Sequence, residues 1–241
     1  SSDREARSRG APSNFEAHLT PWWGPPSELT YRNNEIALGM GYDILRLQGM
    51  KSRLVVDGEE FEGTAYFQKV TVQAPSVPWF WGMLHFDDGS YLDWFMPHIT
   101  PLSTAKDDKP WRKRDTTRVP LKEAGIFHDR VRGETHEFDH CKVELTKSAD
   151  GLLDGEGNIL PDFRIRMWND TTRVDLRISA YSRARWTFDQ PTRGGMVSHL
   201  TYNEYPFEVT SISIHDEMGE RTESDYEWMH GNAEHSWGFL H

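Results

Sequence analysis

Hydrophobic and polar residues alternate over short stretches along most of the chain, a pattern typical of β-strands. In the first half, such runs cover residues 36–47, 53–56, 63–72, 79–86 and 91–96. In the second half, they cover residues 136–147, 163–168, 173–181, 196–202, 207–215 and 227–239. No segment keeps a helical period over three turns. The pattern therefore predicts an all-β, antiparallel fold.

Turn residues separate these runs at regular intervals. Asp57-Gly58 and Asp88-Gly89 stand between two apolar runs each, a strong hairpin signal. Further turn signals are Asp150-Gly151, Asn169-Asp170 and Met218-Gly219. Short, evenly spaced strands of this kind predict a β-barrel or a sandwich.

The predicted organisation is an N-terminal arm followed by two β domains. Residues 1–28 are polar and form the arm, and the long polar loop at 100–123 closes the first domain, 29–123. The second domain is 124–241. A weak repeat relates the segment that starts at Gly63 to the one that starts at Gly231, so the two domains are expected to be related.

The net charge of the chain and the length of its apolar runs exclude some classes of partner. The net charge of −11 argues against nucleic acid, and no apolar run reaches the roughly 18 residues that a membrane-spanning helix needs. The basic cluster Lys109–Arg118 is interpreted as a solvated loop, with an anionic headgroup or an acidic partner as the alternative. The oligomeric state is left open.

Cys141 is the single cysteine, so an internal disulfide and a cysteine-rich metal cage are excluded. This favours a cytoplasmic location. A processed secreted protein stays open, because a removed signal peptide leaves no trace.

Tryptophan is abundant, with 10 residues, and two of them lie in the run 79–86. In a strand, Trp79, Trp81 and His85 share one face, as do Tyr66 and Gln68 in the run before. If all five point inward, they form the aromatic wall of a cavity that binds a hydrophobic small molecule. The alternative is that the indoles fill a dry core.

Two short segments resemble a known family. The first carries G-x-A-Y-x-x-K, W-x-W-G and D-G-x-Y-L; its matching residues are Gly63, Ala65, Tyr66, Trp79, Trp81, Gly82, Asp88, Gly89 and Tyr91. The second is Gly231–Gly238, G-N-A-E-H-S-W-G. Both resemble the carotenoid 1,2-hydratase and tocopherol-cyclase-like superfamily, which is similar to the lipocalin-like Diels–Alderases.

The resemblance implies two tandem lipocalin-like (calycin) barrels and cofactor-free, non-redox chemistry without a metal. The hydratases of this group carry an acidic residue two positions after the tyrosine, where this chain has Gln68. Acid chemistry would therefore pass to Glu234, His235, His85 or Tyr66, since glutamine cannot donate a proton as an acid.

The predicted function is a cofactor-free cyclase, isomerase or hydratase acting on an isoprenoid, polyketide or lipid-like molecule. Glu234 and His235 are the predicted proton-transfer pair, with Tyr66 as a third catalytic residue. Predicted to bind the substrate are Gln68, Trp79, Trp81, His85 and Trp237. The alternative from another class is a non-catalytic carrier with the same fold.

Competing site motifs are weaker. His136-Glu137-x-x-His140 matches a zinc protease signature, but that signature needs a helix and this segment alternates like a strand. A zinc hydrolase is kept only as a remote alternative. Histidines gathered near the C-terminus, such as His230 and His241, would need a geometry that sequence does not provide.

Overall fold

The structure is a computed structural model of the 241-residue chain. It describes residues 14–21, 31–37, 40–72, 77–99, 119–191 and 197–240, with the backbone alone for 31–37, 40 and 237–240. The chain divides into two compact units, Ser1–Ala74 and Pro75–His241.

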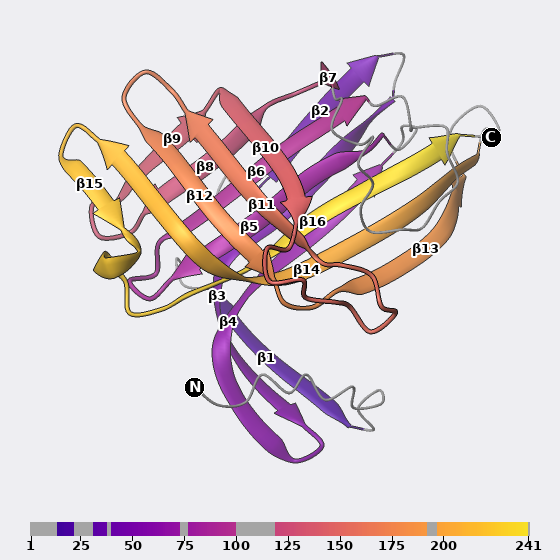
Figure 1. The fold of residues 1–241 in the computed structure, drawn as a ribbon, viewed down its shortest axis with the longest axis horizontal. Coiled ribbons are helices and arrows are strands. Elements are labelled where there is room, and N and C mark those ends of the chain that lie inside the picture. The colour runs from indigo at the N-terminus through magenta and orange to yellow at the C-terminus, as the bar shows by residue number, and fades with distance from the viewer. Residues whose placement is uncertain are drawn as a thin grey trace. The chain divides into compact units, whose positions relative to one another are not determined.

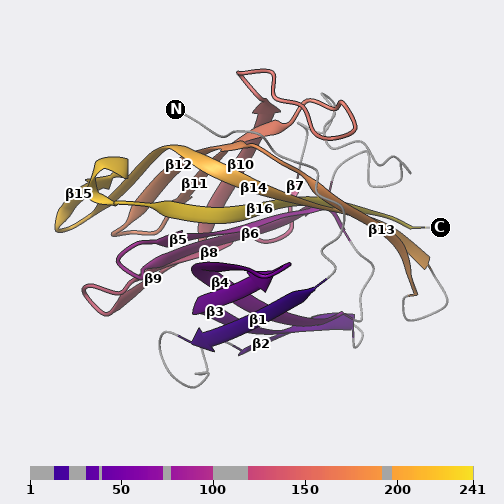
Figure 2. The ribbon, with the colours of Figure 1, turned by 90° about the horizontal axis from the view of Figure 1, so that it is seen from below.

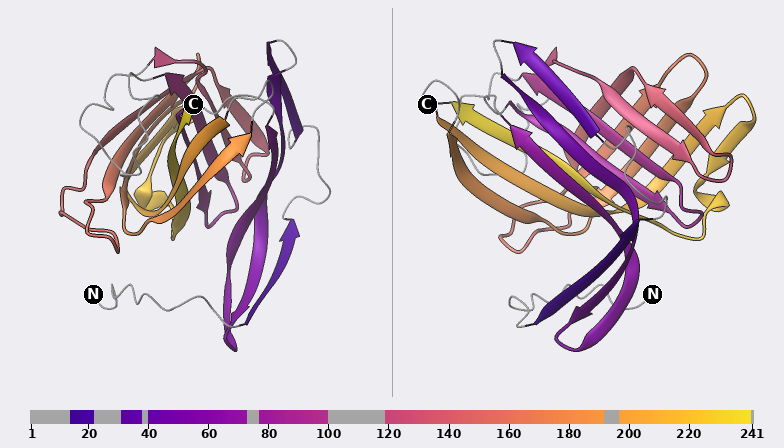
Figure 3. Two further views of the ribbon diagram at one scale, coloured as in Figure 1. Left: turned by 90° about the vertical axis from the view of Figure 1, so that its right-hand side faces the viewer. Right: turned by 180° about the vertical axis from the view of Figure 1, so that it is seen from behind.

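The N-terminal unit is a four-stranded antiparallel sheet built on one long hairpin (Figure 3). Its strands are β1 (Phe15–Pro21), β2 (Tyr31–Ala37), β3 (Met40–Val56) and β4 (Glu59–Val72). Asp57 and Gly58 make the hairpin turn with φ values of 50° and 88°, which confirms the predicted Asp-Gly turn. β2 pairs with the first half of β3 and β1 with its second half.

The C-terminal unit contains a 12-stranded antiparallel sheet whose main path runs β10-β11-β12-β14-β16-β5-β6-β8-β9 (Figure 1). β13 and β15 pair with β14, and β7 pairs with β6. The strands are β5 (Trp79–Phe86), β6 (Tyr91–Ile99), β7 (Val119–Pro120), β8 (Ala124–Asp129), β9 (Glu134–Phe138), β10 (His140–Lys147), β11 (Pro161–Trp168), β12 (Arg173–Ala180), β13 (Ala184–Pro191), β14 (Val197–Asp216), β15 (Gly219–Thr222) and β16 (Met229–Leu240).

This sheet curls into a nearly closed barrel, and Figure 2 shows β10–β12 on the opposite side from β5, β6 and β8. Side chains bridge its two ends. The Cys141 backbone N–H donates to Glu123, 3.0 Å away, and the Asn169 side chain donates to the Glu137 carbonyl at 2.8 Å. The remaining described residues add a single 3₁₀ turn, η3 (Glu223–Asp225).

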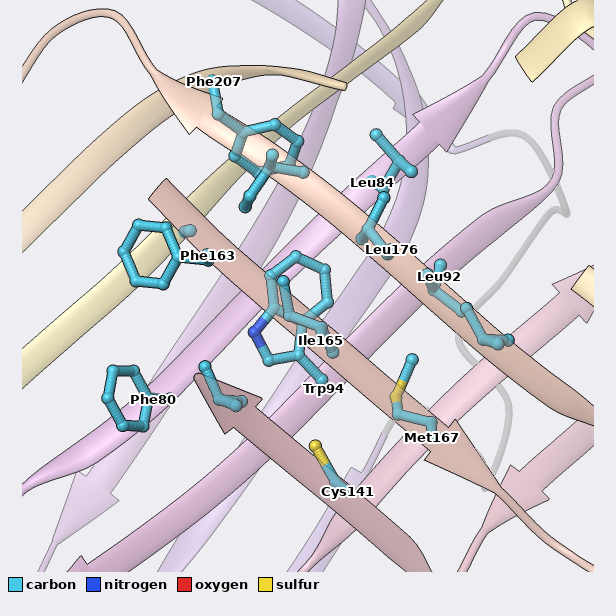
Figure 4. Packing of buried hydrophobic residues seen from close by; sticks show 14 of the residues in the cluster. Phe80, Leu84, Leu92, Trp94, Cys141, Phe163, Ile165, Met167, Leu176 and Phe207 are labelled. Atoms are coloured by element: carbon cyan, nitrogen blue, oxygen red, sulfur yellow. The ribbon is translucent and has the colours of Figure 1, made fainter. Parts of the chain in front are cut away.

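Alternate residues of the strands fill the interior of the curled sheet with a hydrophobic core. Figure 4 shows Leu92 and Trp94 of β6 pointing into the same cluster as Ile165 and Met167 of β11. A Cβ on Gly82 would overlap the Trp94 indole, so glycine is needed here to let this large ring pack against β5. The interior of this sheet is thus a packed core.

A buried ion-pair network closes one end of this core. Arg221 donates to Asp129 at 2.7 Å and to Asp216 at 3.0 Å, while Arg132 donates to Asp216 at 2.6 Å. Asp129 is fully buried, so these cations compensate the cost of removing its charge from water. The network joins the β8–β9 turn to the β14–β15 hairpin.

The predicted antiparallel all-β fold with a barrel is confirmed. The chain divides at a different place from the one expected, because the boundary between the two units follows Ala74. The predicted boundary at 123/124 lies within one continuous sheet, since β6 pairs both with β7, before this boundary, and with β8, after it. The predicted arm 1–28 contributes Asn14 and β1, and its other residues lie outside the described part of the chain, as does the basic cluster Lys109–Arg118. Among the described residues, no helix has the length and hydrophobicity to cross a membrane.

Candidate functional site

Three neighbouring strands, β14, β16 and β5, bring two glutamates side by side. Glu204 of β14 lies opposite Glu234 of β16, which lies opposite Trp81 of β5. The sequence neighbours Tyr205 and Ala233 belong to the core cluster, and successive residues of a strand point to opposite faces. Both glutamates therefore lie on the face of the sheet that points away from the core.

Glu234 is held by two aromatic side chains. The Trp79 Nε1–H donates to Glu234 Oε2 at 2.8 Å, and the Tyr202 hydroxyl donates to Glu234 Oε1. The two rings meet edge to face, with their centroids 5.6 Å apart and their planes at 63°. Glu234 retains 3% of its surface exposed, so this carboxyl is almost removed from water.

Glu204 is half-buried and accepts a hydrogen bond from the Asn232 amide. Burial raises the pKa of Glu204, while hydrogen bonds with Asn232, Glu234 and Tyr202 lower it in part. Burial also raises the pKa of Glu234, and the negative charge of Glu204 raises it further, to about 8, against the lowering effect of the bonds from Tyr202 and Trp79. At neutral pH the raised pKa therefore keeps a proton on Glu234.

Both oxygens of the Glu234 carboxyl accept a hydrogen bond. Oε2 accepts from the Trp79 indole, which can only donate, and Oε1 accepts from the Tyr202 hydroxyl. These two bonds fix the orientation of the carboxyl. A neutral, buried carboxylic acid in this position can donate a proton to a bound molecule, which is the role of a general acid.

Exposed aromatic side chains lie on the same face of the sheet. Trp186 of β13 lies opposite Tyr202, and Phe188 lies opposite Leu200. Directly opposed residues share a face. Trp186 is 69% exposed and Phe188 is 38% exposed. An apolar surface therefore extends from Tyr202 to the neighbouring strand β13.

Trp79, Trp81 and His85 share one face of β5, but the orientation of this face is the reverse of the one expected. Phe80 and Leu84 belong to the core, so Trp79, Trp81 and His85 lie on the other face of β5. Trp81 and His85 are buried there. The reason is that β5 is apolar on both faces, so its pattern alone could not tell which face meets the core.

Glu234 and His235 do not form the predicted proton-transfer pair. They are adjacent in β16 and point to opposite faces of the sheet. His235 stacks on Phe80 of the core cluster, with the ring centroids 4.4 Å apart. The structure thus places Glu234 in a polar cluster and His235 on the core side.

The other predicted site residues are spread over the chain. Tyr66 and Gln68 lie in β4 of the N-terminal unit, where both are half-buried and Gln68 accepts a 2.8 Å hydrogen bond from Arg46. Trp237 continues β16, and its side chain lies outside the described residues. Of the residues predicted from sequence, the structure brings together Trp79, Trp81 and Glu234.

The zinc protease signature lies on strands, as its alternation indicated. His136 is in β9 and His140 in β10. His136 contacts the Thr172 hydroxyl at 3.0 Å, whereas His140 stacks on Trp168 with centroids 4.9 Å apart. No group of three or more His, Cys, Asp or Glu side chains that could hold a metal occurs among the residues that the structure describes. His241 lies outside them.

Three residues of the cluster were missed by sequence reasoning: Tyr202, Glu204 and Asn232. Tyr202 and Glu204 alternate with buried residues in β14, so strand parity could have placed them on one face. Their pairing with β16 depends on the register, which a single sequence did not provide.

Comparisons with known proteins give fold-level matches only. No protein-family profile and no curated protein matches the sequence. A solved structure assigned as AttH of Nitrosomonas europaea matches with a TM-score of 0.48 and 14% identity, over 94% of this chain and 63% of that chain. Kievitone hydratase of Nectria haematococca matches with a TM-score of 0.37 and 13% identity, over 86% of this chain and 65% of that chain. The chain thus spans less than two thirds of the length of either protein.

Proposed function

We propose that this protein is a cofactor-free hydratase, isomerase or cyclase that protonates an unsaturated, apolar small molecule, with Glu234 as the general acid. The observation that supports this most strongly is the enclosure of the Glu234 carboxyl by Trp79, Tyr202 and Glu204. A general acid needs a proton at working pH and a donor held in a fixed position, and this arrangement supplies both.

The neighbouring side chains suit a substrate that becomes positively charged on protonation. The π faces of Trp79 and Tyr202 can stabilise a cation, and the carboxylate of Glu204 adds a negative charge close by. The exposed rings of Trp186 and Phe188 offer apolar contact area on the same face. An isoprenoid, polyketide or lipid-like olefin fits these features better than a polar molecule.

The test is proton transfer itself, followed in deuterated water. The protein is incubated with unsaturated probes, such as farnesol and linoleic acid, and mass spectrometry detects deuterium on carbon. The Glu234→Gln variant should lose about 10²–10⁴-fold in rate, the usual contribution of a general acid. Its affinity, measured by quenching of tryptophan fluorescence, should stay near the wild-type value because glutamine keeps the shape of the side chain.

Glu208→Gln is the matched control, since Glu208 is an exposed carboxylate of the same strand as Glu204. Equal rates in the Glu234→Gln variant and the wild-type protein would refute the assignment of the acid. Binding of the probes without any deuterium incorporation by the wild-type protein would indicate the carrier function instead.

A further inference from the structure

In the proposed mechanism, Glu234 must regain a proton after each transfer to a substrate. Glu234 is 3% exposed, so water has almost no direct access to its carboxyl. After each transfer it would remain as a buried carboxylate, which is unfavourable in this environment. Some neighbouring group must therefore return a proton from solvent.

Among the residues that the structure describes, three groups contact the Glu234 carboxyl, and they differ in their ability to carry a proton. The Trp79 indole donates a hydrogen bond but cannot release and regain its proton at ordinary pH. The Tyr202 hydroxyl can relay a proton only by accepting one as it gives one up. The Glu204 carboxyl can hold either state, because a carboxylate is a base and a carboxylic acid is a donor.

Glu204 also occupies the right position between Glu234 and solvent. It lies directly opposite Glu234 in the register of β14 and β16, where Cβ atoms are about 5 Å apart. Glu204 and its partner Asn232 are both partly exposed, unlike Glu234. The Asn232 amide donates to Glu204 Oε2 and so holds the Glu204 carboxyl in place.

We propose that Glu204 is the proton-relay residue of this site, through which the acidic proton of Glu234 exchanges with solvent. This inference rests on the proposed function in one respect, that Glu234 gives its proton away. It goes beyond that function by assigning the resupply route to a residue that need not touch the substrate.

Protons and electrons balance over the whole cycle. Glu234 gives its proton to a substrate carbon, and the π electrons of the double bond form the new C–H bond. Glu204, once protonated by water, passes its proton to the Glu234 carboxylate and returns to the carboxylate form. The proton that the cationic substrate or the added water molecule later loses neutralises the hydroxide left in solvent.

The relay can be measured without any substrate. At about pH 6, below the pKa of Glu234, the protonated carboxyl has an infrared C=O band that shifts when its hydrogen is replaced by deuterium. The Glu234→Gln variant assigns this band by losing it. After rapid mixing of the full chain with D₂O, the rate of the band shift reports how fast the Glu234 proton exchanges with solvent.

We expect exchange to slow by about tenfold or more in Glu204→Gln, since the relay must then use a less suitable group. Glu204→Asp, which keeps a carboxyl in the strand, should exchange faster than Glu204→Gln and so exclude a purely structural effect. Glu208→Gln should exchange at the wild-type rate.

Equal exchange rates in Glu204→Gln and the wild-type protein would overturn the proposal, as would slowing in Tyr202→Phe alone. A band that survives in Glu234→Gln would also overturn it, because the protonated carboxyl would then be another residue. The deuterium-incorporation assay is independent of these outcomes: if Glu234→Gln keeps full activity there, the proposed function fails while the exchange result stands.

Discussion

The stability of the C-terminal unit should depend on pH through Glu234. Its pKa is raised from 4.5 to about 8 in the folded protein, chiefly by burial and then by the charge of Glu204. In the unfolded chain the carboxyl is exposed and regains its ordinary pKa. Between these two values the folded state binds more protons than the unfolded state, so stability must fall as the pH rises.

The size of the effect follows from the shift. One pKa unit corresponds to about 1.4 kcal/mol, which gives an upper limit of about 5 kcal/mol lost between about pH 4.5 and pH 8. The contribution is fully present below the unfolded pKa and is lost as the pH passes through the folded value. Because each carboxyl influences the ionisation of the other, we expect about 2–5 kcal/mol in practice.

The Glu234→Gln variant removes this titration and keeps a neutral side chain of the same shape. Urea unfolding of both proteins, followed by tryptophan fluorescence from about pH 5 to about pH 9, gives the free energy of unfolding at each pH. The difference between variant and wild type should shift in favour of the variant as the pH rises. A difference that does not change with pH, or changes in the opposite direction, would refute a buried and neutral Glu234.

Three further changes test the site and the fold. Trp79→Phe removes a bond that favours the ionised form of Glu234, so it should raise the pKa of this carboxyl, as measured by its infrared band. Gly82→Ala forces a methyl group into the Trp94 ring and should lower the free energy of unfolding in urea by about 1–3 kcal/mol. Arg221→Met removes a cation from the buried carboxylates of Asp129 and Asp216 and should lower the free energy of unfolding by about 3–5 kcal/mol.

Each change has a control elsewhere in the chain. Trp186→Phe alters an exposed indole and should leave the Glu234 band in place. Gly155→Ala meets open space, and Arg166→Met removes an exposed ion pair, so each should change stability by less than about 1 kcal/mol. Site and control variants with equal effects would contradict the corresponding contact.

The sequence predicted the strands of the C-terminal unit better than their arrangement. β5 spans 79–86, as the apolar run indicated, and β11 and β12 begin and end within two residues of the predicted ranges. β5 was recognised as a continuous apolar run, whereas β11 and β12 carry apolar residues at alternate positions. β7, β8, β13 and β15 were missed, although Ala184, Trp186 and Phe188 of β13 alternate with polar residues.

Sequence reasoning identified only some residues of the candidate site. Glu234 and Trp79 were selected from short motifs, but the partner Glu204 lies 30 residues earlier in the chain, on a strand whose register no local signal fixes. His235 was predicted to transfer protons together with Glu234, but adjacent residues of a strand point to opposite faces of the sheet.

The charge pairing elsewhere in this sheet argues that the two glutamates are retained for a role other than stability. Arg164 meets Asp175 through two hydrogen bonds of 3.1 and 2.6 Å, and Arg166 meets Glu144 across the neighbouring pair of strands. These are favourable opposite-charge contacts. Glu204 and Glu234 instead oppose two groups of like charge; burial raises the pKa of both, and the charge of Glu204 raises that of Glu234 further. Two opposed carboxyls make no favourable charge contact with each other, whereas the proton donation proposed for Glu234 would give the pair a chemical role.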